Sequence, residues 1–142
     1  MTIRLIRPGS LYANAPYAYA SVAPHGSLIF TAGACPLDEN GEVVGDIRAQ
    51  ASMAVANLRI ALAESGSSLA DVLKTTIYVV SAERADLVAA WDVIRAAFGD
   101  HDAPSTLLGV TVLGWPGQLV EIEAVAVAAP SGGADARQDR LP

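Results

Sequence analysis

The segment LVEIEAVAVA, residues 119–128, constrains the fold most, because it has the pattern of a β-strand that is apolar on both faces. Side chains alternate across a strand. One face carries Leu119, Val125 and Val127, and the other carries Val120, Ile122 and Ala124. Both faces of such a strand must be covered. The chain offers only two helical patterns, enough for one face, so we expect a homo-oligomer in which sheets pack against each other.

Two segments predict amphipathic helices. In the first, apolar residues recur at three- and four-residue steps after Asp46, whose side chain can accept the free N–H groups of the first turn. This helix is expected to end at Gly66, which can adopt the left-handed conformation of a C-cap. The second helix is expected to follow a Ser81 cap and to end at Gly99. Its apolar stripe is formed by Leu87, Trp91, Ile94 and Phe98.

Short β-branched or alternating segments predict the strands. They lie at residues 3–6, 17–23, 27–34, 71–80, 105–113 and 119–128. Gly26 can form a tight turn that pairs 17–23 with 27–34 as a hairpin. We also expect the last two strands to form a hairpin through residues 114–117. A helix between strands favours a βαβ crossover, so both helices should cover one face of a mixed sheet.

Composition limits the class of protein. A chain of 142 residues with 52% hydrophobic residues predicts one globular domain over residues 1–128, followed by a polar tail at 129–142. The net charge is −6, Lys74 is the only lysine and the arginines are scattered, which argues against nucleic-acid binding. No membrane span or signal peptide is expected. The single cysteine, Cys35, permits no intramolecular disulfide and is compatible with a reducing, cytoplasmic location.

The most unusual chemical feature is a pair of carboxylates, Glu121 and Glu123, inside the last strand. They share one face with apolar neighbours, and a buried carboxylate is costly unless it is paired or hydrogen-bonded. Carboxylates in such places are candidate general acids or bases, or groups that position water. The alternative is an edge or interface strand whose glutamates meet solvent or an arginine of a neighbouring subunit.

Other polar residues give weaker signals. Tyr17 could offer its phenol to a ligand, although tyrosines more often lie at the edge of a core. Cys35 reads as a small buried residue, since no motif supplies a base to activate it. His25 and His101 have no partner at metal-ligand spacing, so we expect no metal site. The glycines lack a phosphate-binding spacing, which gives nucleotide cofactors no support.

Several short motifs occur in order between about residue 12 and residue 128. They are Ala15-Pro16-Tyr17, LIFTAG (28–33), GEVVGD (41–46), Gln50 with Asn57-Leu58, SLADVLKTTIY (68–78), Pro104-Ser105-Thr106 and VEIEAVA (120–126). Together they resemble the Rid family of small reactive-intermediate deaminases, also called the YjgF or L-PSP family. The resemblance implies a chorismate-mutase-like α+β fold, assembled as a homotrimer with clefts between subunits.

The resemblance also implies an activity. The best-known members of the family hydrolyse enamines and imines to keto acids and ammonia without a cofactor. An arginine holds the substrate carboxylate, and the first glutamate of the Glu-Ile-Glu run positions water. Glu121 matches that glutamate, Tyr17 matches the pocket tyrosine, and Gly33 matches a glycine that lines the cleft. Thr31 belongs to the same motif as Gly33, and Trp91 stands where other members often have asparagine.

The main departure from the family is Ser105, which we align with the substrate-binding arginine. A serine hydroxyl cannot replace a bidentate guanidinium. The alternative is that Arg4 or Arg7 reaches the cleft and supplies the guanidinium. One hypothesis is therefore a hydrolase of imines or related small carbonyl compounds, in which Glu121 orients water and Tyr17, Ser105 and Thr106 bind a less acidic substrate. The other is a non-catalytic trimer that binds or senses a small molecule through Glu121. Endoribonuclease activity is disfavoured by the negative charge.

Overall fold

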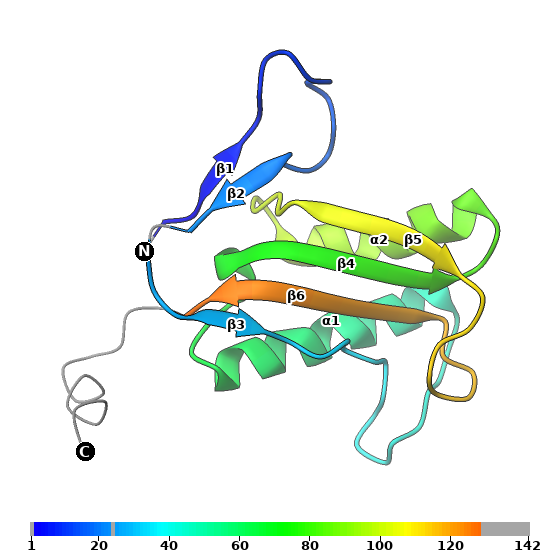
Figure 1. Ribbon diagram of the computed structural model, residues 1–142. Coiled ribbons are helices and arrows are strands. Elements are labelled where there is room, and N and C mark those ends of the chain that lie inside the picture. The colour runs from blue at the N-terminus through cyan, green and yellow to red at the C-terminus, as the bar shows by residue number, and fades with distance from the viewer. Residues whose placement is uncertain (1, 24, 129–142) are drawn as a thin grey trace, which may run out of the picture.

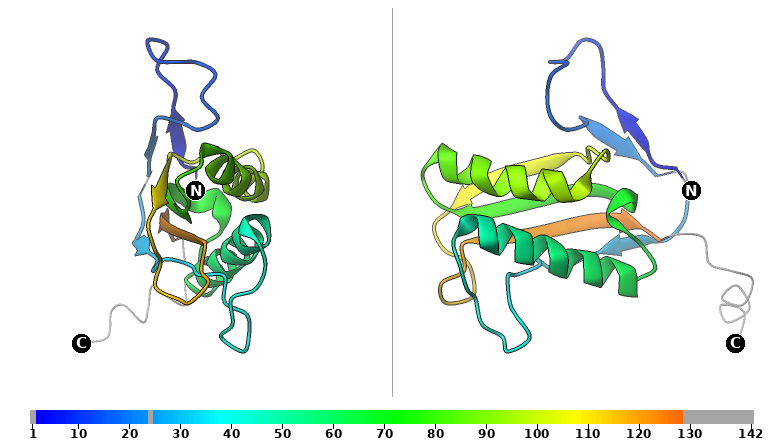
Figure 2. Two further views of the ribbon diagram at one scale, coloured as in Figure 1. Left: turned by 90° about the vertical axis from the view of Figure 1, so that its right-hand side faces the viewer. Right: turned by 180° about the vertical axis from the view of Figure 1, so that it is seen from behind.

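A mixed four-stranded sheet forms the centre of the protein, and both helices cover the same face of it (Figure 1). The computed structural model describes residues 2–23 and 25–128, so the predicted tail at 129–142 lies outside the described residues. The elements are β1 (Arg4–Ile6), β2 (Ala20–Val22), β3 (Leu28–Phe30), α1 (Ile47–Glu64), a 3₁₀ turn (Leu69–Asp71), β4 (Val72–Val80), α2 (Arg84–Phe98), β5 (Ser105–Val110) and β6 (Val120–Val127). The two layers, seen edge-on in Figure 2, are the α+β architecture that the sequence predicts.

The strand order is β3-β6-β4-β5. Strands β4 and β5 are parallel and are joined by α2, which confirms the expected βαβ crossover. Strand β6 runs antiparallel to β3 on one side and to β4 on the other. The predicted hairpin between residues 105–113 and 119–128 is therefore wrong. The crossover returns the chain beside β4, and β4 separates the two segments.

The predicted hairpin between residues 17–23 and 27–34 is also wrong. Strand β2 pairs with β1 in a separate two-stranded sheet, and β3 pairs with β6. Gly26 has a positive φ of 117°, as a turn requires, but the chain here passes from one sheet to the other. Pro24, the first residue of the predicted turn, lies outside the described residues. Gly26 therefore determines where the chain changes direction. It does not determine which strand β2 or β3 pairs with.

Local capping explains the helix boundaries. Asp46 Oδ1 accepts the Ala49 N–H at 2.9 Å, as expected of an N-cap. At the other end of α1, Gly66 has a φ of 80°, and the backbone bonds around it form a Schellman motif. For α2 the predicted cap is wrong: the helix begins two residues later than expected, with Glu83 at the N-cap. Ser81 Oγ instead accepts the Glu83 N–H, at 2.9 Å, ahead of the helix.

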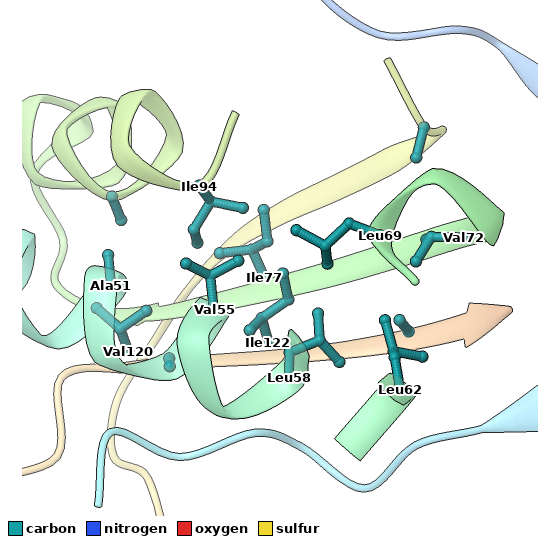
Figure 3. Close-up of a cluster of buried hydrophobic side chains, with 14 of the residues drawn as sticks. Ala51, Val55, Leu58, Leu62, Leu69, Val72, Ile77, Ile94, Val120 and Ile122 are labelled. Carbon is teal, nitrogen blue, oxygen red and sulfur yellow. The ribbon is translucent and has the colours of Figure 1, made fainter. Parts of the chain in front are cut away.

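The hydrophobic core fills the space between the helices and the sheet (Figure 3). Its largest members are almost completely shielded from solvent, and they come from both helices and the two central strands. They are Leu58 and Leu62 of α1, Ile94 of α2, Ile77 of β4 and Ile122 of β6. This packing uses only one face of β6.

The opposite face of the sheet is uncovered in the protomer, and Figure 1 looks onto it. Apolar side chains there remain exposed: Leu28 by 53%, Phe30 by 72% and Leu108 by 42% of their surface. This is the face on which the sequence predicts a second copy of the chain. It also carries Glu121 and Glu123, which places the candidate chemistry on the open side of the sheet.

Candidate functional site

Glu121 and Glu123 occupy successive positions on the open face of β6. In the register of the sheet, Glu121 lies opposite Tyr78 of β4, and Glu123 lies opposite Thr76. The residues between and beside the glutamates point into the core, so the alternation predicted from the sequence is observed. Both glutamates are half-buried, because the sheet and the neighbouring loops shield part of each side chain.

The loop after β3 supplies the immediate surroundings of Glu121. Ala34 forms an isolated bridge with Ile122, with N···O distances of 2.7 and 3.2 Å, and so holds the loop against β6. The two residues that flank this bridge, Gly33 and Cys35, both face the Glu121 carboxylate. Cys35 Sγ lies 3.2 Å from Glu121 Oε1. Gln118 Nε2 donates to the same oxygen from the turn before β6, also at 3.2 Å.

Gly33 is required by the position of this carboxylate. A Cβ atom at residue 33 would overlap with Oε2 and Cδ of Glu121 and would stand 2.8 Å from its Cγ. The backbone of Gly33 does not have a positive φ, so the requirement is one of space. The structure thus brings together Gly33 and Glu121, two residues that the resemblance assigns separately to the cleft, with the carboxylate lying directly on the glycine.

Glu123 belongs to a neighbouring cluster on the same face. Tyr78 Oη donates to Glu123 Oε1 at 2.5 Å, and this bond raises the pKa of Tyr78, with smaller contributions from burial and from the charges of both glutamates. Thr31 is also here, and its Oγ1 accepts the Ala124 N–H at 3.0 Å. A pocket of ≈ 240 Å³ is lined by Phe30, Thr31, Lys74, Thr76, Glu123, Ala124 and Val125.

Thr106 of β5 lies on the open face as well. Lys74 Nζ donates to Thr106 Oγ1 at 2.5 Å, and burial lowers the pKa of Lys74. Lys74 stands opposite Val125 in the sheet register, four positions along β6 from Glu121. Thr106 therefore contacts this cation and not the Glu121 carboxylate within one protomer.

Ser105 lies on the other face of β5, so within one protomer it does not face the Glu121 carboxylate. It pairs with Thr75, whose hydroxyl donates to Ser105 Oγ at 2.6 Å, and Ser105 Oγ in turn donates to the Ala103 carbonyl at 3.0 Å. Two physical features separate Ser105 from Glu121. Strand β4 stands between β5 and β6, and the side-chain alternation turns Ser105 towards the helices.

Tyr17 and Trp91 gather with Ser105 at the outer edge of β5. The two aromatic rings meet edge to face, with centroids 6.4 Å apart. A pocket of ≈ 330 Å³ is lined by Pro16, Tyr17, Trp91, Ser105 and Leu107. The sequence-predicted residues therefore form two groups in a protomer: an open-face group around Glu121 and an edge group around Tyr17.

Arg7 does not take the place of the missing arginine at Glu121. Its guanidinium forms an ion pair with Asp102 at 2.7 Å and donates to the carbonyl oxygens of Ala15 and Tyr17 at 3.3 and 3.0 Å. Arg95 approaches the same carboxylate, with Nε 3.7 Å from Asp102 Oδ1. These contacts hold the loop that carries Tyr17 beside the end of α2.

Two residues of the site, Cys35 and Gln118, were not predicted from the sequence as site residues. Cys35 lies 86 positions before Glu121, and nothing local to it in the sequence indicates that a carboxylate stands beside its thiol. Burial raises the pKa of Cys35, and the hydrogen bond to Glu121 and its charge raise it further. The only sequence signal for Gln118 is a polar residue in the apolar approach to β6.

Comparison with known proteins places this geometry in a family. The family model described as Endoribonuclease L-PSP matches residues 9–128. A RutC family protein of Pyrococcus abyssi is 34% identical over 110 residues, 76% of this chain and 84% of the relative. The 2-iminobutanoate/2-iminopropanoate deaminase of Salmonella typhimurium is 32% identical over 120 residues, 80% of this chain and 92% of that enzyme.

A solved structure agrees with the sequence comparison. The conserved Rid-family protein YyfB of Yersinia pestis superposes with a TM-score of 0.83 at 35% identity, over 89% of this chain and 99% of that one. The fold is that of a small α+β protein of the Rid type. The chain belongs to the Rid family, as the sequence motifs predict.

Two further findings bear on the type of site. Within residues 2–23 and 25–128, no helix is long and apolar enough to cross a membrane. In the same part of the chain, no three His, Cys, Asp or Glu side chains come together as a candidate metal site.

Proposed function

We propose that the protein is a hydrolase of imines and enamines, with Glu121 as the group that positions the attacking water. The observation that carries the proposal is the Glu121 carboxylate, which is fixed through Oε1 and lies on Gly33 beside the open face of the sheet. The deaminase relative supports the reaction type. The reaction needs water and a carboxylate and requires no cofactor.

In the proposed chemistry Glu121 accepts one proton and later returns it. Water adds to the carbon of the protonated C=N bond while Glu121 accepts a proton from the water. Glu121 then returns this proton to the nitrogen of the resulting carbinolamine. The C–N bond breaks as the C=O bond forms, and the hydroxyl proton passes to the released ammonia, which leaves as ammonium. A carboxylate with one oxygen held by donors and the other free is suited to these steps.

We propose that the preferred substrate is an imine without a carboxylate group. Ser105 occupies the position that we align with the family's arginine, and the Arg7 guanidinium is occupied by Asp102. A charge-assisted hydrogen bond contributes about 1.5–3 kcal/mol, so losing a bidentate pair weakens binding of 2-imino acids by orders of magnitude. Binding of imines that carry no carboxylate is not weakened by this change. We also propose a cytoplasmic location, where an enzyme that removes reactive metabolites would act.

The assembly we propose is a homotrimer whose clefts join the open-face group of one subunit to the edge group of another. The exposed apolar surface around Phe30 supports this, because its burial between subunits is favourable.

Sedimentation equilibrium is expected to give about three times the chain mass of 14.6 kDa. Phe30→Asp is expected to dissociate the trimer, whereas Ile60→Asp, on the 62% exposed outer side of α1, leaves it intact. A monomeric wild-type protein would contradict the proposal.

The function is tested with two imines generated in situ. An amino acid oxidase acting on 2-aminobutanoate supplies 2-iminobutanoate, and a flavin-dependent amine oxidase acting on benzylamine supplies an imine without a carboxylate. Competition with semicarbazide, which traps the imine, measures hydrolysis. We expect acceleration of both imines, with the higher kcat/KM for the carboxylate-free one.

The same experiment separates the alternative function. A protein that accelerates neither imine, but whose Tm rises with a small carbonyl compound, is the non-catalytic small-molecule-binding or regulatory trimer, because binding to the native state raises apparent stability. A higher kcat/KM for 2-iminobutanoate would contradict the proposed substrate class.

A further inference from the structure

Two donors converge on a single oxygen of the Glu121 carboxylate. Cys35 Sγ and Gln118 Nε2 each lie 3.2 Å from Oε1, and they reach it from different segments of the chain. Cys35 follows β3 by five residues, and Gln118 precedes β6 by two. An ionised carboxylate only accepts hydrogen bonds, so a thiol S–H and an amide N–H are both suitable partners.

The orientation of the Gln118 amide is set by its own contacts. Its Oε1 accepts the Trp115 backbone N–H at 3.2 Å, so Nε2 must face the other way. There, Nε2 donates to the Val120 carbonyl at 3.1 Å and to Glu121 Oε1. Gln118 is only 4% exposed, and a flipped amide would place an oxygen against two acceptors. The amide therefore acts as a fixed donor to Glu121.

The thiol of Cys35 is also held in place. Asn57 of α1 donates to the carbonyl oxygens of Cys35 and Leu37 at 2.8 and 3.0 Å, which ties the loop to the helix. Burial and the neighbouring carboxylate raise the pKa of Cys35, so the thiol is protonated at neutral pH. A protonated thiol is a hydrogen-bond donor and a poor nucleophile.

The second carboxylate oxygen, Oε2, is left for chemistry. It lies directly on the backbone of Gly33. Among residues 2–23 and 25–128, none donates a hydrogen bond to it. In that same part of the chain no buried side-chain oxygen or nitrogen lacks a partner, so Oε2 is accessible to solvent. One oxygen is thus immobilised and the other can hold water or a substrate N–H.

We propose that Cys35 and Gln118 are positioning residues for Glu121: they bind Oε1 together and so direct Oε2 towards the reacting water. The inference rests on the proposed function, in which Glu121 positions that water. It assigns to the cysteine the role of a donor and not of a nucleophile.

The first test measures imine hydrolysis by variants with the carboxylate-free imine as the probe. Gln118→Met keeps the length of the side chain and removes both amide groups; we expect kcat to fall by about 10²-fold with little change in KM, as for a displaced catalytic group. Cys35→Ala is expected to lower kcat by a smaller factor. Cys35→Ser supplies an O–H donor and is expected to restore most of the activity. Val112→Ala, at a 75% exposed position in the same connection, is the control that keeps wild-type kcat.

The second test needs no turnover. Cys35 is the only cysteine, so the pH dependence of its alkylation by iodoacetamide, followed by intact mass, reports its pKa. Glu121→Gln is expected to lower the pKa of Cys35, because it removes the negative charge beside the thiol. Gln118→Met is expected to raise the pKa of Cys35, because the amide N–H stabilises the thiolate.

The outcomes separate this inference from the proposed function. Opposite shifts in the Cys35 pKa together with the fall in kcat support the positioning role. An active wild-type protein with an equally active Gln118→Met variant would overturn the positioning role and leave the hydrolase intact. A fall in kcat in Cys35→Ser equal to that in Cys35→Ala would overturn the assignment of the cysteine as a hydrogen-bond donor. An inactive wild-type protein would overturn the proposed function, and the positioning role with it.

Discussion

Replacement of Glu121 by glutamine is expected to lower kcat for imine hydrolysis by about 10²–10⁴-fold, the usual contribution of a positioned acid–base group. The amide retains an oxygen that can accept from Cys35 and Gln118, so the side chain keeps its place. What it loses is the ability to accept a proton from water. KM is expected to change little, and the measurement is the semicarbazide competition with the carboxylate-free imine.

The matched comparison is Glu123→Gln on the same strand and face. Its Oε1 accepts from Tyr78 Oη, and its neighbours differ from those of Glu121. We expect a far smaller fall in kcat than for Glu121→Gln. Equal losses in the two variants would mean that the site depends on the net charge of the strand and not on one positioned carboxylate.

Gly33→Ala tests the role of the same carboxylate by changing the residue on which it lies. The new Cβ would overlap with the carboxylate, which must then move away from its donors on Cys35 and Gln118. We therefore expect kcat of the folded variant to fall by about 10²-fold, since displacing a reacting group by about 1 Å has that effect. Wild-type kcat in this variant would contradict the assignment of Glu121.

Local chemistry explains which parts of the fold were predictable. The bounds of α1 follow from the Asp46 cap and the Gly66 C-cap, which act over a few residues. The alternation of β6 follows from the strand period. Both hairpins were mispredicted. Gly26 marks a turn but does not determine which strand β3 pairs with, and β4 lies between β5 and β6. Strand pairing depends on contacts that are distant in sequence.

The site shows the same division. Gly33 and Glu121 were each assigned to the cleft through the family resemblance, and the structure brings them into contact. The contact between Cys35 and Glu121 spans 86 positions and is created by the Ala34–Ile122 bridge, which no local pattern predicts. Ser105 and Glu121 were expected on two strands of one hairpin, because the position of β4 between β5 and β6 cannot be read from the connection that joins them.

Replacement of Gln50 by leucine is expected to cause the largest loss of stability. This side chain is 2% exposed; its Nε2 donates to the carbonyl oxygens of Gly45 and Gly117 at 3.0 and 3.1 Å, and its Oε1 accepts the Leu119 N–H at 2.7 Å. Leucine leaves all three backbone groups without this partner, at about 1–3 kcal/mol each where water cannot reach them. We expect the unfolding free energy to fall by about 3–6 kcal/mol, measured by urea denaturation.

The control for Gln50→Leu is Arg48→Leu, at an exposed position of the same helix, which is expected to change the unfolding free energy by less than about 0.5 kcal/mol. A second consequence distinguishes the role of Gln50 from simple packing. Gln50 bonds to the residues on either side of Gln118, so its loss also frees the amide that holds Glu121. Folded Gln50→Leu protein is therefore expected to lose kcat as well as stability. If it kept wild-type kcat, the turn before β6 would hold Gln118 without help from α1.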